Sequence, residues 1–441
     1  MSGVDTPAEA SSDEWEWPGS RWWRCDLHAH TPSSHDFSGS GVTAAHIVQA
    51  ASAAGLHAIG VTDHNTVASL AELETAAART NPRLVVFPGT EITSNEGAHL
   101  LVLFAPGSSA DAVKGYLGDC GIPGEKWGKH DAHAKVTYAD CIRKADAIGA
   151  LCVAAHADRP AAGTKKHTSL LHVISGQGLI DVLAMPKLHA AEIATSDAAA
   201  HTQLLARDPV TALPIRPCLA GSDAHALSQL GQESTWIKMS RPEQEGLRLA
   251  FADGEMSVRI ATPGDAPNEH ASLVIESISV SDGKLMGRGS PFVLRLNPWL
   301  NAIIGGRGTG KSSVVEFLRL ALRREDELPP GLQLNFKEFA QVPTNSRSDR
   351  GLLTSSTQVS VVYRKYSSRF RVQWSQSGSQ PSIEEDVRGV WTAAEGAVAE
   401  RFPVRIYSQK QIFELAEGPE SLLRVIDESA QARQLEAATR R

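Results

Sequence analysis

The feature that most constrains the fold is an alternation, between residues 21 and 262, of short apolar runs and Ala-rich segments with helical spacing. This alternation predicts strands separated by helices, hence a parallel sheet, and seven such runs in one domain predict a closed α/β barrel. In barrels of this kind, chemistry takes place where strands end and loops begin. The runs lie at 22–27, 56–62, 84–88, 100–104, 150–155, 179–184 and 215–220, with helical candidates at 43–54, 66–78, 138–148 and 197–206.

Residues that bind metals stand at the ends of these runs. The first run ends in Asp26-Leu27-His28-Ala29-His30, and strand side chains repeat every two residues, so both imidazoles point the same way. Adjacent imidazoles suit zinc, manganese or iron. Asp36 also follows the first run, and His99 opens the fourth. The ends of the other runs bring further histidines and carboxylates to the same edge, which predicts a metal site: His64, Glu91, His156, Asp223 and His225.

The order Asp-Leu-His-Ala-His, Thr-Asp-His-Asn, Gly-Thr-Glu, Ala-His and Gly-Ser-Asp-Ala-His resembles the PHP (polymerase and histidinol phosphatase) domain, over residues 21–262. The resemblance implies a distorted (β/α)7 barrel that binds two or three divalent ions (Mn, Zn or Fe) and hydrolyses phosphoesters. His99 is the looser match, and His35 competes with Asp36, which the family's spacing favours. The implied metal ligands are His28, His30, Asp36, His64, Glu91, His99, His156, Asp223 and His225.

Two residues are candidates for a catalytic role beside the metal ligands. Arg159 follows His156 closely and would bind a substrate phosphate through two parallel hydrogen bonds. A surface salt bridge is the alternative for Arg159. Asp63 precedes His64, and we expect it to orient His64 or another ligand rather than act as a base.

A second functional region follows a Pro/Gly-rich linker at 263–271, which predicts a domain boundary. Strands are expected at 272–280, 292–296 and 300–304, then a G-x-x-x-x-G-K-S loop, then a helix at 313–322. In such a loop the backbone N–H groups surround phosphates, the lysine reaches the β/γ oxygens and the serine binds magnesium. The predicted ATP-binding residues are Gly305, Gly306, Arg307, Gly308, Thr309, Gly310, Lys311, Ser312, Ser313 and Gln409.

Residues 272–418 resemble the N-terminal lobe of ABC- and SMC-type ATPases, including double-strand-break-repair members. Val404–Gln409 looks like the strand that ends in their Q-loop glutamine, and 419–441 is either the root of a coiled-coil arm or a plain helix. No LSGGQ-like stretch is present, and Asp427 and Glu428 are interpreted as exposed helix residues. The resemblance therefore implies a missing second ATPase half, from the rest of the protein or another chain, and a possible homodimer.

Composition narrows the class of function. The net charge of −7 argues against non-specific coating of nucleic acid but leaves room for a local basic groove. The basic run at 363–371 has two interpretations: it faces nucleic acid, or it is the solvent-exposed face of a strand. The first 20 residues are expected to be a disordered leader without a signal peptide, and no stretch is long and apolar enough to span a membrane. Five cysteines without CxxC spacing fit the cytoplasm.

These observations predict a metal-dependent phosphoesterase, preferably a nuclease acting on DNA or RNA, coupled to an ATP-binding module with bound magnesium. A role in DNA repair, nucleic-acid processing or defence would follow. Two alternatives stay open: a small-molecule phosphatase for nucleotides or sugar phosphates, and a non-catalytic scaffold that senses metal or nucleotide.

Overall fold

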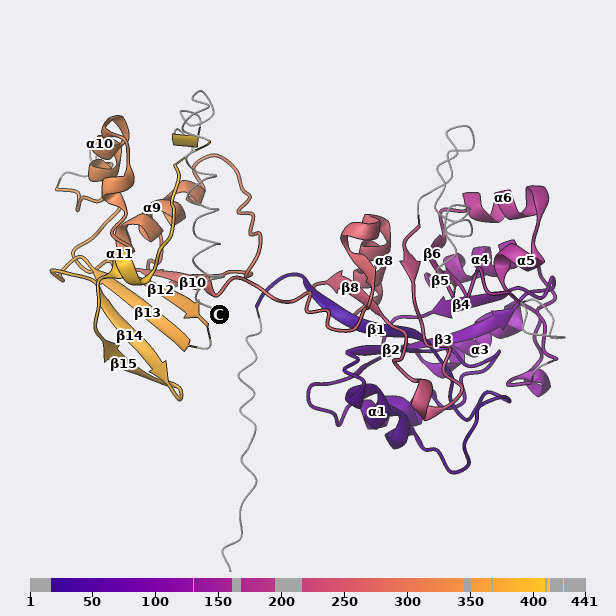
Figure 1. Ribbon diagram of the computed structural model, residues 1–441. Helices are drawn as coiled ribbons and strands as arrows, with labels where there is room; N and C mark the ends of the chain where they lie inside the picture. The colour runs from indigo at the N-terminus through magenta and orange to yellow at the C-terminus, as the bar shows by residue number, and fades with distance from the viewer. Residues whose placement is uncertain are drawn as a thin grey trace, which may run out of the picture. The chain divides into compact units, whose positions relative to one another are not determined.

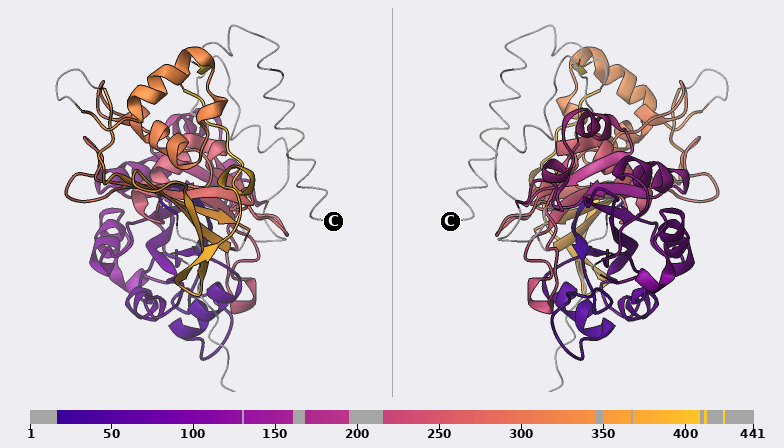
Figure 2. Two further views of the ribbon diagram at one scale, coloured as in Figure 1. Left: turned by 90° about the vertical axis from the view of Figure 1, so that its left-hand side faces the viewer. Right: turned by 90° about the vertical axis from the view of Figure 1, so that its right-hand side faces the viewer.

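The computed structural model describes residues 17–129, 131–160, 168–194, 216–344, 350–366, 368–408, 411–412 and 423. The chain divides into two compact units, one of Gly19–Glu269 and one of the described residues in Met1–Pro18 and His270–Arg441. Figure 1 shows the elements of both units, and Figure 2 shows them from two further sides. Among the described helices, none combines the length and the hydropathy needed to span a membrane.

The first unit, here called the barrel unit, is an α/β domain built on one nine-stranded sheet with the order β7-β6-β5-β4-β3-β2-β1-β8-β9. Strands β1 to β3 run parallel to one another (Figure 1). Strands β5 to β7 also run parallel to one another. The strands are β1 (Arg21–Ala29), β2 (Ala58–Val61), β3 (Val85–Thr93), β4 (His99–Leu103), β5 (Leu151–Ala154), β6 (Leu188–Glu192), β7 (Cys218–Leu219), β8 (Thr235–Met239) and β9 (Val258–Ile260).

The sheet closes almost into a barrel at a seam between β7 and the pair β1/β8. Just beyond β7, Ala224 forms an isolated parallel bridge with Ala29 of β1, and the His30 N–H donates to the Ala224 carbonyl oxygen at 3.1 Å. On the β8 side, the Thr235 hydroxyl accepts from the Ala220 N–H at 2.8 Å and donates to its carbonyl oxygen at 2.9 Å. Asp26 of β1 adds a second side-chain link, since its carboxylate accepts the N–H of Ser222 at 3.1 Å and the Ser222 hydroxyl at 2.6 Å. One isolated bridge and these side chains therefore join the sheet at the seam, where other strands are joined by a hydrogen-bonded ladder.

Alternate strand side chains supply two separate cores, one on each face of the sheet. Leu100 and Val102 of β4 pack with residues of the surrounding helices α1 to α4, whereas Leu101 and Leu103 pack with α8. The helices of this unit are α1 (Ala44–Ala53), α2 (Leu70–Ala77), α3 (Ala110–Asp119), α4 (Tyr138–Ala147), α5 (Leu170–Val173), α6 (Gly176–Ala184) and α8 (Gln244–Asp253).

Strand β4 departs from the predicted all-parallel sheet, because it runs antiparallel to both β3 and β5. The loop 94–98 between β3 and β4 is a tight turn in which the Ser94 N–H donates to the Ala98 carbonyl oxygen at 2.9 Å. A parallel connection needs a dozen or more residues, so this loop permits a hairpin alone. The first residue of β4, His99, therefore lies opposite Thr93 at the end of β3.

The predicted strand at 179–184 is wrong, since these residues belong to helix α6. Short apolar runs suit a buried helix as well as a strand, and here Val182 and Leu183 are buried while Ile180 is exposed. The strand that follows α6 is β6. Strands β8 and β9 were not predicted, and the helix expected at 197–206 lies outside the described residues.

A histidine on β6 predicts a pH-dependent stability. His189 Nδ1 accepts the backbone N–H of Cys152 at 3.1 Å, which requires a neutral ring. Burial, helped by the charge of Lys187, lowers the pKa of His189 to about 4. An unfolded histidine titrates near 6.5, so the unfolded chain binds more protons between about pH 6.5 and about pH 4. Stability should therefore fall as the pH falls through this window.

Urea unfolding at about pH 7.5 and about pH 5 tests this expectation. The His189→Asn variant keeps an acceptor for the Cys152 N–H but cannot titrate. Its unfolding midpoint should fall less on acidification than that of the native chain. Equal falls in both proteins would contradict the assignment.

The second unit, the loop unit, has a six-stranded antiparallel sheet with the order β11-β10-β12-β13-β14-β15. Helices α9 and α10 pack Val314, Phe317 and Phe336 against one face of this sheet. The elements are β10 (Leu273–Ser281), β11 (Phe292–Arg295), α9 (Lys311–Ala321), α10 (Pro330–Phe339), β12 (Gln358–Lys365), β13 (Ser368–Ser375), β14 (Ser382–Val387), β15 (Val390–Ala394) and α11 (Val398–Arg401).

The basic run at 363–371 lies on β12 and β13, where its arginines are paired with carboxylates. Arg369 contacts Glu276 at 2.8 Å, and Arg371 contacts Glu384 at 2.7 Å. These pairs neutralise the run, which agrees with a solvated strand face.

Two predicted strands of the loop unit are wrong, because 300–304 and 404–408 are not strands. Leu300 and Ile304 are 89% and 91% exposed. A strand forms where neighbouring strands satisfy its backbone groups, and no described strand pairs with either segment. Gln409, Asp427 and Glu428 lie outside the described residues, as does the helix expected at 419–441 apart from position 423.

Candidate metal centre

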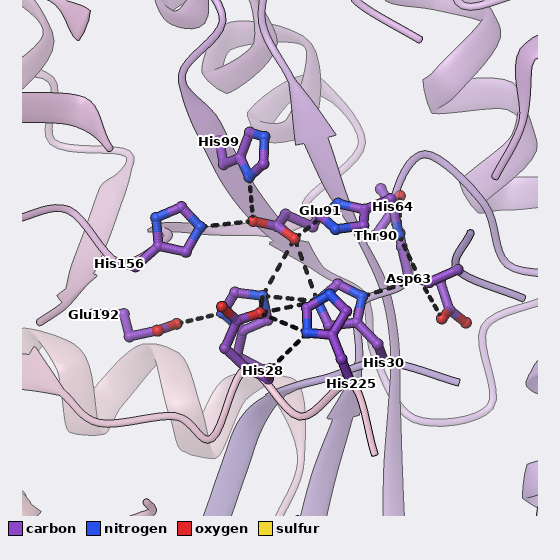
Figure 3. Close-up of polar contacts among 12 residues, drawn as sticks. His28, His30, Asp63, His64, Thr90, Glu91, His99, His156, Glu192 and His225 are labelled. Atoms are coloured by element: carbon purple, nitrogen blue, oxygen red, sulfur yellow. Dashed lines mark hydrogen bonds and ion pairs between the residues drawn. The ribbon is translucent and has the colours of Figure 1, made fainter. Parts of the chain in front are cut away.

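Glu91, near the end of β3, is a fully buried carboxylate around which the site is arranged. Its Oε1 lies 2.6 Å from His99 Nδ1 and 3.1 Å from His156 Nε2. Its Oε2 faces three further histidines, as Figure 3 shows. The distances are 3.0 Å to His64 Nδ1, 3.3 Å to His28 Nε2 and 3.3 Å to His30 Nε2. His99 reaches Glu91 because β4 runs back from the edge at which β3 ends.

Asp223 follows β7 and crosses the seam to the histidines of β1. Its Oδ1 lies 3.2 Å from His28 Nε2 and 3.1 Å from His30 Nε2. Its other oxygen forms an ion pair with the guanidinium of Arg159, a side chain that is 40% exposed. Arg159 is thus at the rim of the site, one carboxylate away from the histidine cluster.

Asp36 lies on the open side of the site, with a side chain that is 40% exposed. Its Oδ2 lies 3.1 Å from His225 Nε2 and 3.4 Å from His64 Nε2. The competing residue, His35, lies 3.9 Å from the other oxygen of Asp36. Asp36 is therefore the residue of this loop whose carboxylate joins the two histidines.

Three groups of side chains have potential ligand atoms within 4.8 Å of one another among the described residues. The groups overlap, because His30, His64 and Glu91 each belong to two of them. Sets of imidazoles and carboxylates suit zinc, manganese or iron. The groups are His30/His64/His225, His28/His30/Glu91/Asp223 and His64/Glu91/His99.

The donor atoms themselves fit divalent ions. Glu91 Oε2 is buried and has no hydrogen-bond partner among the described residues, although three histidine nitrogens surround it. His225 Nε2 is also buried without a hydrogen bond, although Asp36 Oδ2 lies 3.1 Å from it. Buried polar atoms without partners are costly, and divalent ions at these atoms would satisfy both.

A chain of hydrogen bonds fixes which nitrogen His30 presents to the cluster. The Ser34 hydroxyl donates to Asp63 Oδ1 at 2.8 Å, so it accepts from His30 Nδ1 at 3.0 Å. His30 Nε2 is then free to bind a metal. Asp63 also accepts the N–H and the hydroxyl of Thr31, both at 2.7 Å. Asp63 therefore acts on His30 through Ser34, and its contact with His64 is indirect, through the His64 backbone N–H on Ser34.

Glu192 is a site residue that the sequence analysis missed. It ends β6, is 2% exposed, and its Oε2 lies 2.7 Å from His28 Nδ1. This contact directs His28 Nε2 towards Glu91 and Asp223. The sequence did contain a signal for this residue, namely a carboxylate directly after the apolar pair Ala190-Ala191. Because a strand was predicted at 179–184, the end of the real strand, β6, was not considered as a ligand position.

Removing the Glu192 carboxylate is expected to weaken metal binding without removing a ligand. Partners that orient metal-binding histidines contribute about 10–100-fold in affinity. Glu192→Ala should lower metal affinity by that factor, measured by competition with a chromophoric chelator. Glu192→Gln should recover part of the loss, since its amide oxygen still accepts from His28 Nδ1. Equal losses in both variants would point to a packing effect instead.

The charges of the cluster are strongly coupled. Burial alone would raise the pKa of Glu91, but attraction to His99, His64 and His28 outweighs it and holds the pKa well below its usual range. Burial would lower the pKa of His64, yet Glu91 and Asp36 raise it to about 10. The carboxylates thus favour the protonated forms of His28, His64 and His225 in the metal-free chain, and bound metal ions would replace those protons.

The phosphate-binding loop of the loop unit forms a second candidate site. Helix α9 begins at Lys311, directly after Gly310, which has the left-handed φ of +90° that favours glycine. Lys311 Nζ donates to the carbonyl oxygens of Gly305 at 2.7 Å and Gly306 at 2.6 Å. The N-terminus of an α-helix favours anions, so a bound phosphate would compete for Lys311.

Cavities of about 650 Å³ and about 610 Å³ flank this loop, and both include Lys311 and Ser312. The larger one also includes Glu316, Phe336 and Tyr407. The smaller one also includes Met286, Phe292 and Ser313. The predicted partner Gln409 lies outside the described residues.

No family model matches the chain, and no curated protein matches it. Among solved structures, it is similar to a lesion-specific endonuclease from Pyrococcus furiosus, with 20% identity and a TM-score of 0.41 over 54% of this chain. The chain spans 58% of that endonuclease.

Two further structures are more distant. A proposed metal-dependent phosphoesterase from Bifidobacterium adolescentis has 18% identity and a TM-score of 0.31, over 46% of this chain and 87% of that one. A structure from work on ATP-driven dimerization and DNA-stimulated activation of SMC ATPases has 16% identity and a TM-score of 0.24, over 35% and 98%. At these distances the similarities assign no activity to this chain.

Proposed function

We propose that the barrel unit is a metal-dependent phosphodiesterase that cuts nucleic acid, with DNA as the preferred substrate. The observation that carries the proposal is the buried carboxylate of Glu91, which five histidines surround and which belongs to two of three overlapping ligand groups. Metal ions a few ångströms apart are the usual means of phosphoester hydrolysis. The PHP-like motifs of the sequence point to the same chemistry.

The residues around the ligands have separable roles in this proposal. Bound ions would supply Lewis acidity to the phosphoryl group and lower the pKa of water. Arg159 would exchange its ion pair with Asp223 for the non-bridging oxygens of the substrate, since guanidinium binds phosphate with two parallel hydrogen bonds. Asp63, acting through Ser34, holds His30 in the orientation that binding requires.

Nucleic acid is favoured over a small phosphoester for two reasons. The side of the site that carries Asp36 and Arg159 is open, with each side chain 40% exposed, which leaves room for a chain that continues beyond the cleaved bond. The same polypeptide also carries a phosphate-binding loop of the kind found in ATPases that act on DNA, an argument by analogy.

The loop unit is proposed to bind ATP with magnesium but to hydrolyse it slowly by itself. Lys311, Ser312 and the amides of the loop provide phosphate contacts, whereas the carboxylate that lines the same cavity, Glu316, is paired with Arg319 at 3.1 Å. The exposed Leu300 and Ile304 next to the loop support a missing half, from elsewhere in the protein or another chain, that supplies the absent strands. Steady ATP hydrolysis at about 1 per second, which is in the ordinary enzyme range, would refute the proposal that the ATPase site is incomplete.

One experiment tests the proposed phosphodiesterase. The full chain, loaded with manganese, is assayed against single-stranded DNA, duplex DNA, RNA and a panel of mononucleotides, and its metal content is measured. We expect two or three metal equivalents and cleavage of polymers far faster than of mononucleotides. Efficient turnover of one small phosphomonoester would support the phosphatase alternative, and metal-free protein with full activity would refute the metal centre.

A further inference from the structure

Strands β1, β8 and β9 bring aromatic and cationic side chains together on one face of the barrel unit, away from the metal centre. In the antiparallel register Trp22 lies opposite Lys238, and Trp236 lies opposite Arg259. Residues directly opposite in a sheet share a face. We call Trp22, Trp236, Lys238 and Arg259 the aromatic–cationic face.

This face is not part of the hydrophobic cores. Its neighbours in sequence, Trp23 and Ile237, point the other way into the core that contains α8, whereas Trp22 and Trp236 belong to neither core. Both tryptophans are half-buried, which leaves part of each indole in contact with solvent.

The cations of this face are accessible. Lys238 makes no ion pair with any described residue. Arg259 lies 6.0 Å from the centre of the Trp22 ring, is 46% exposed, and contacts the Asp265 carboxylate at 2.7 Å. Two cations against one carboxylate give a positive face on a chain whose net charge is −7.

We propose that the aromatic–cationic face binds single-stranded nucleic acid next to the segment that the metal centre cleaves, an inference that rests on the proposed nuclease function. Unpaired bases stack on aromatic side chains of a sheet surface, while neighbouring cations contact the phosphates. Duplex bases are already stacked on each other, so the tryptophans give a preference for single strands. The positive charge at Lys238 and Arg259 complements the backbone.

Strand β1 itself sets the distance between the two sites. Trp22 and His28 lie six residues apart on β1, which is about 20 Å at about 3.3 Å per residue. Stacked nucleotides rise about 3.4 Å each along one strand, so a substrate needs at least about six nucleotides beyond the cut to reach the face. Shorter oligonucleotides should gain nothing from it.

Binding of a labelled oligodeoxythymidine well above that length, in chelator so that no cleavage occurs, tests the proposal on the full chain. Lys238→Ala/Arg259→Ala removes two phosphate contacts, so the slope of log affinity against log salt should fall in magnitude by about 1.4, at about 0.7 per contact. Lys114→Ala/Arg143→Ala is the matched control, since it removes two exposed cations from α3 and α4. The control should keep the native slope.

Trp236→Leu tests the stacking separately, because it keeps an apolar side chain without an aromatic ring. Loss of one stacked base should weaken binding by about 5- to 150-fold, and Trp236→Phe should stay close to native. Three results would each overturn the proposal. The matched control could lose as much affinity as the face variants, neither face variant could lose affinity, or the face variants could lose equal affinity for duplex and single-stranded DNA.

Hydrolysis of bis(p-nitrophenyl) phosphate with manganese separates this proposal from the nuclease itself. This small diester does not reach the aromatic–cationic face, so the variants should hydrolyse it at the native rate. A native chain that is inert towards the diester and towards every polymer would refute the nuclease, whereas unchanged oligonucleotide binding in the face variants would refute the face alone.

Discussion

Glu91→Gln should abolish most of the phosphodiesterase activity and most of the metal binding together. The substitution keeps the shape of the side chain but removes the charge that five histidines share. Leaving one partner of a buried charge pair uncompensated costs about 3–5 kcal/mol, which is a loss of about a hundredfold to several thousandfold. Metal content and diester hydrolysis are the measurements.

The matched control is Glu96→Gln, five residues along the same chain segment. Glu96 accepts the Tyr138 N–H through both oxygens, at 3.0 and 3.2 Å, and contacts no histidine of the cluster. This variant should keep metal and activity near the native level. If Glu91→Gln kept its metal and its rate, the central carboxylate would have no role in the site.

Lys311→Ala should remove most nucleotide binding and leave the metal content of the barrel unit unchanged. Hydrogen bonds from a charged donor contribute about 1.5–3 kcal/mol each, so the loss of the phosphate contacts should weaken ATP binding by at least about tenfold. Binding of a fluorescent ATP analogue is the measurement, with metal analysis on the same samples.

Lys337→Ala controls for the lost positive charge, since Lys337 is an exposed residue of α10 in the same unit. It should bind nucleotide as the native chain does. Two results would argue against a phosphate site at the loop: native affinity in Lys311→Ala, or equal weakening in both variants.

The local sequence was enough to predict which side chains lie together in the candidate metal centre, because parallel strands collect the residues that follow them at one edge. His28, His30 and Asp223 needed no more than this rule. His99 was harder, since it begins its strand, and it reaches Glu91 through the hairpin of β3 and β4. Glu192 was missed because an apolar run alone does not distinguish strand β6 from helix α6.

The segment before the phosphate-binding loop shows where local sequence is not enough to predict a strand. Leu300 to Ile304 has the composition of a buried strand, yet a strand also needs pairing partners, which come from any part of the sequence or from another chain. No described strand provides them. The apolar composition therefore predicted a segment that could form a strand. The exposure of Leu300 and Ile304 indicates that the neighbouring strands it would pair with are not among the described residues.

Metal ions bound at the proposed centre would have a second task at the seam of the barrel unit. Asp223 and His225 lie on the β7 side of the seam, and His28 and His30 on the β1 side, where Ala29–Ala224 is an isolated bridge. An ion bound by residues of both sides would link them where the backbone forms only an isolated bridge. Stripping the metal should therefore speed amide exchange at Ala220 and His30 first, which makes cofactor loading a step in completing the fold.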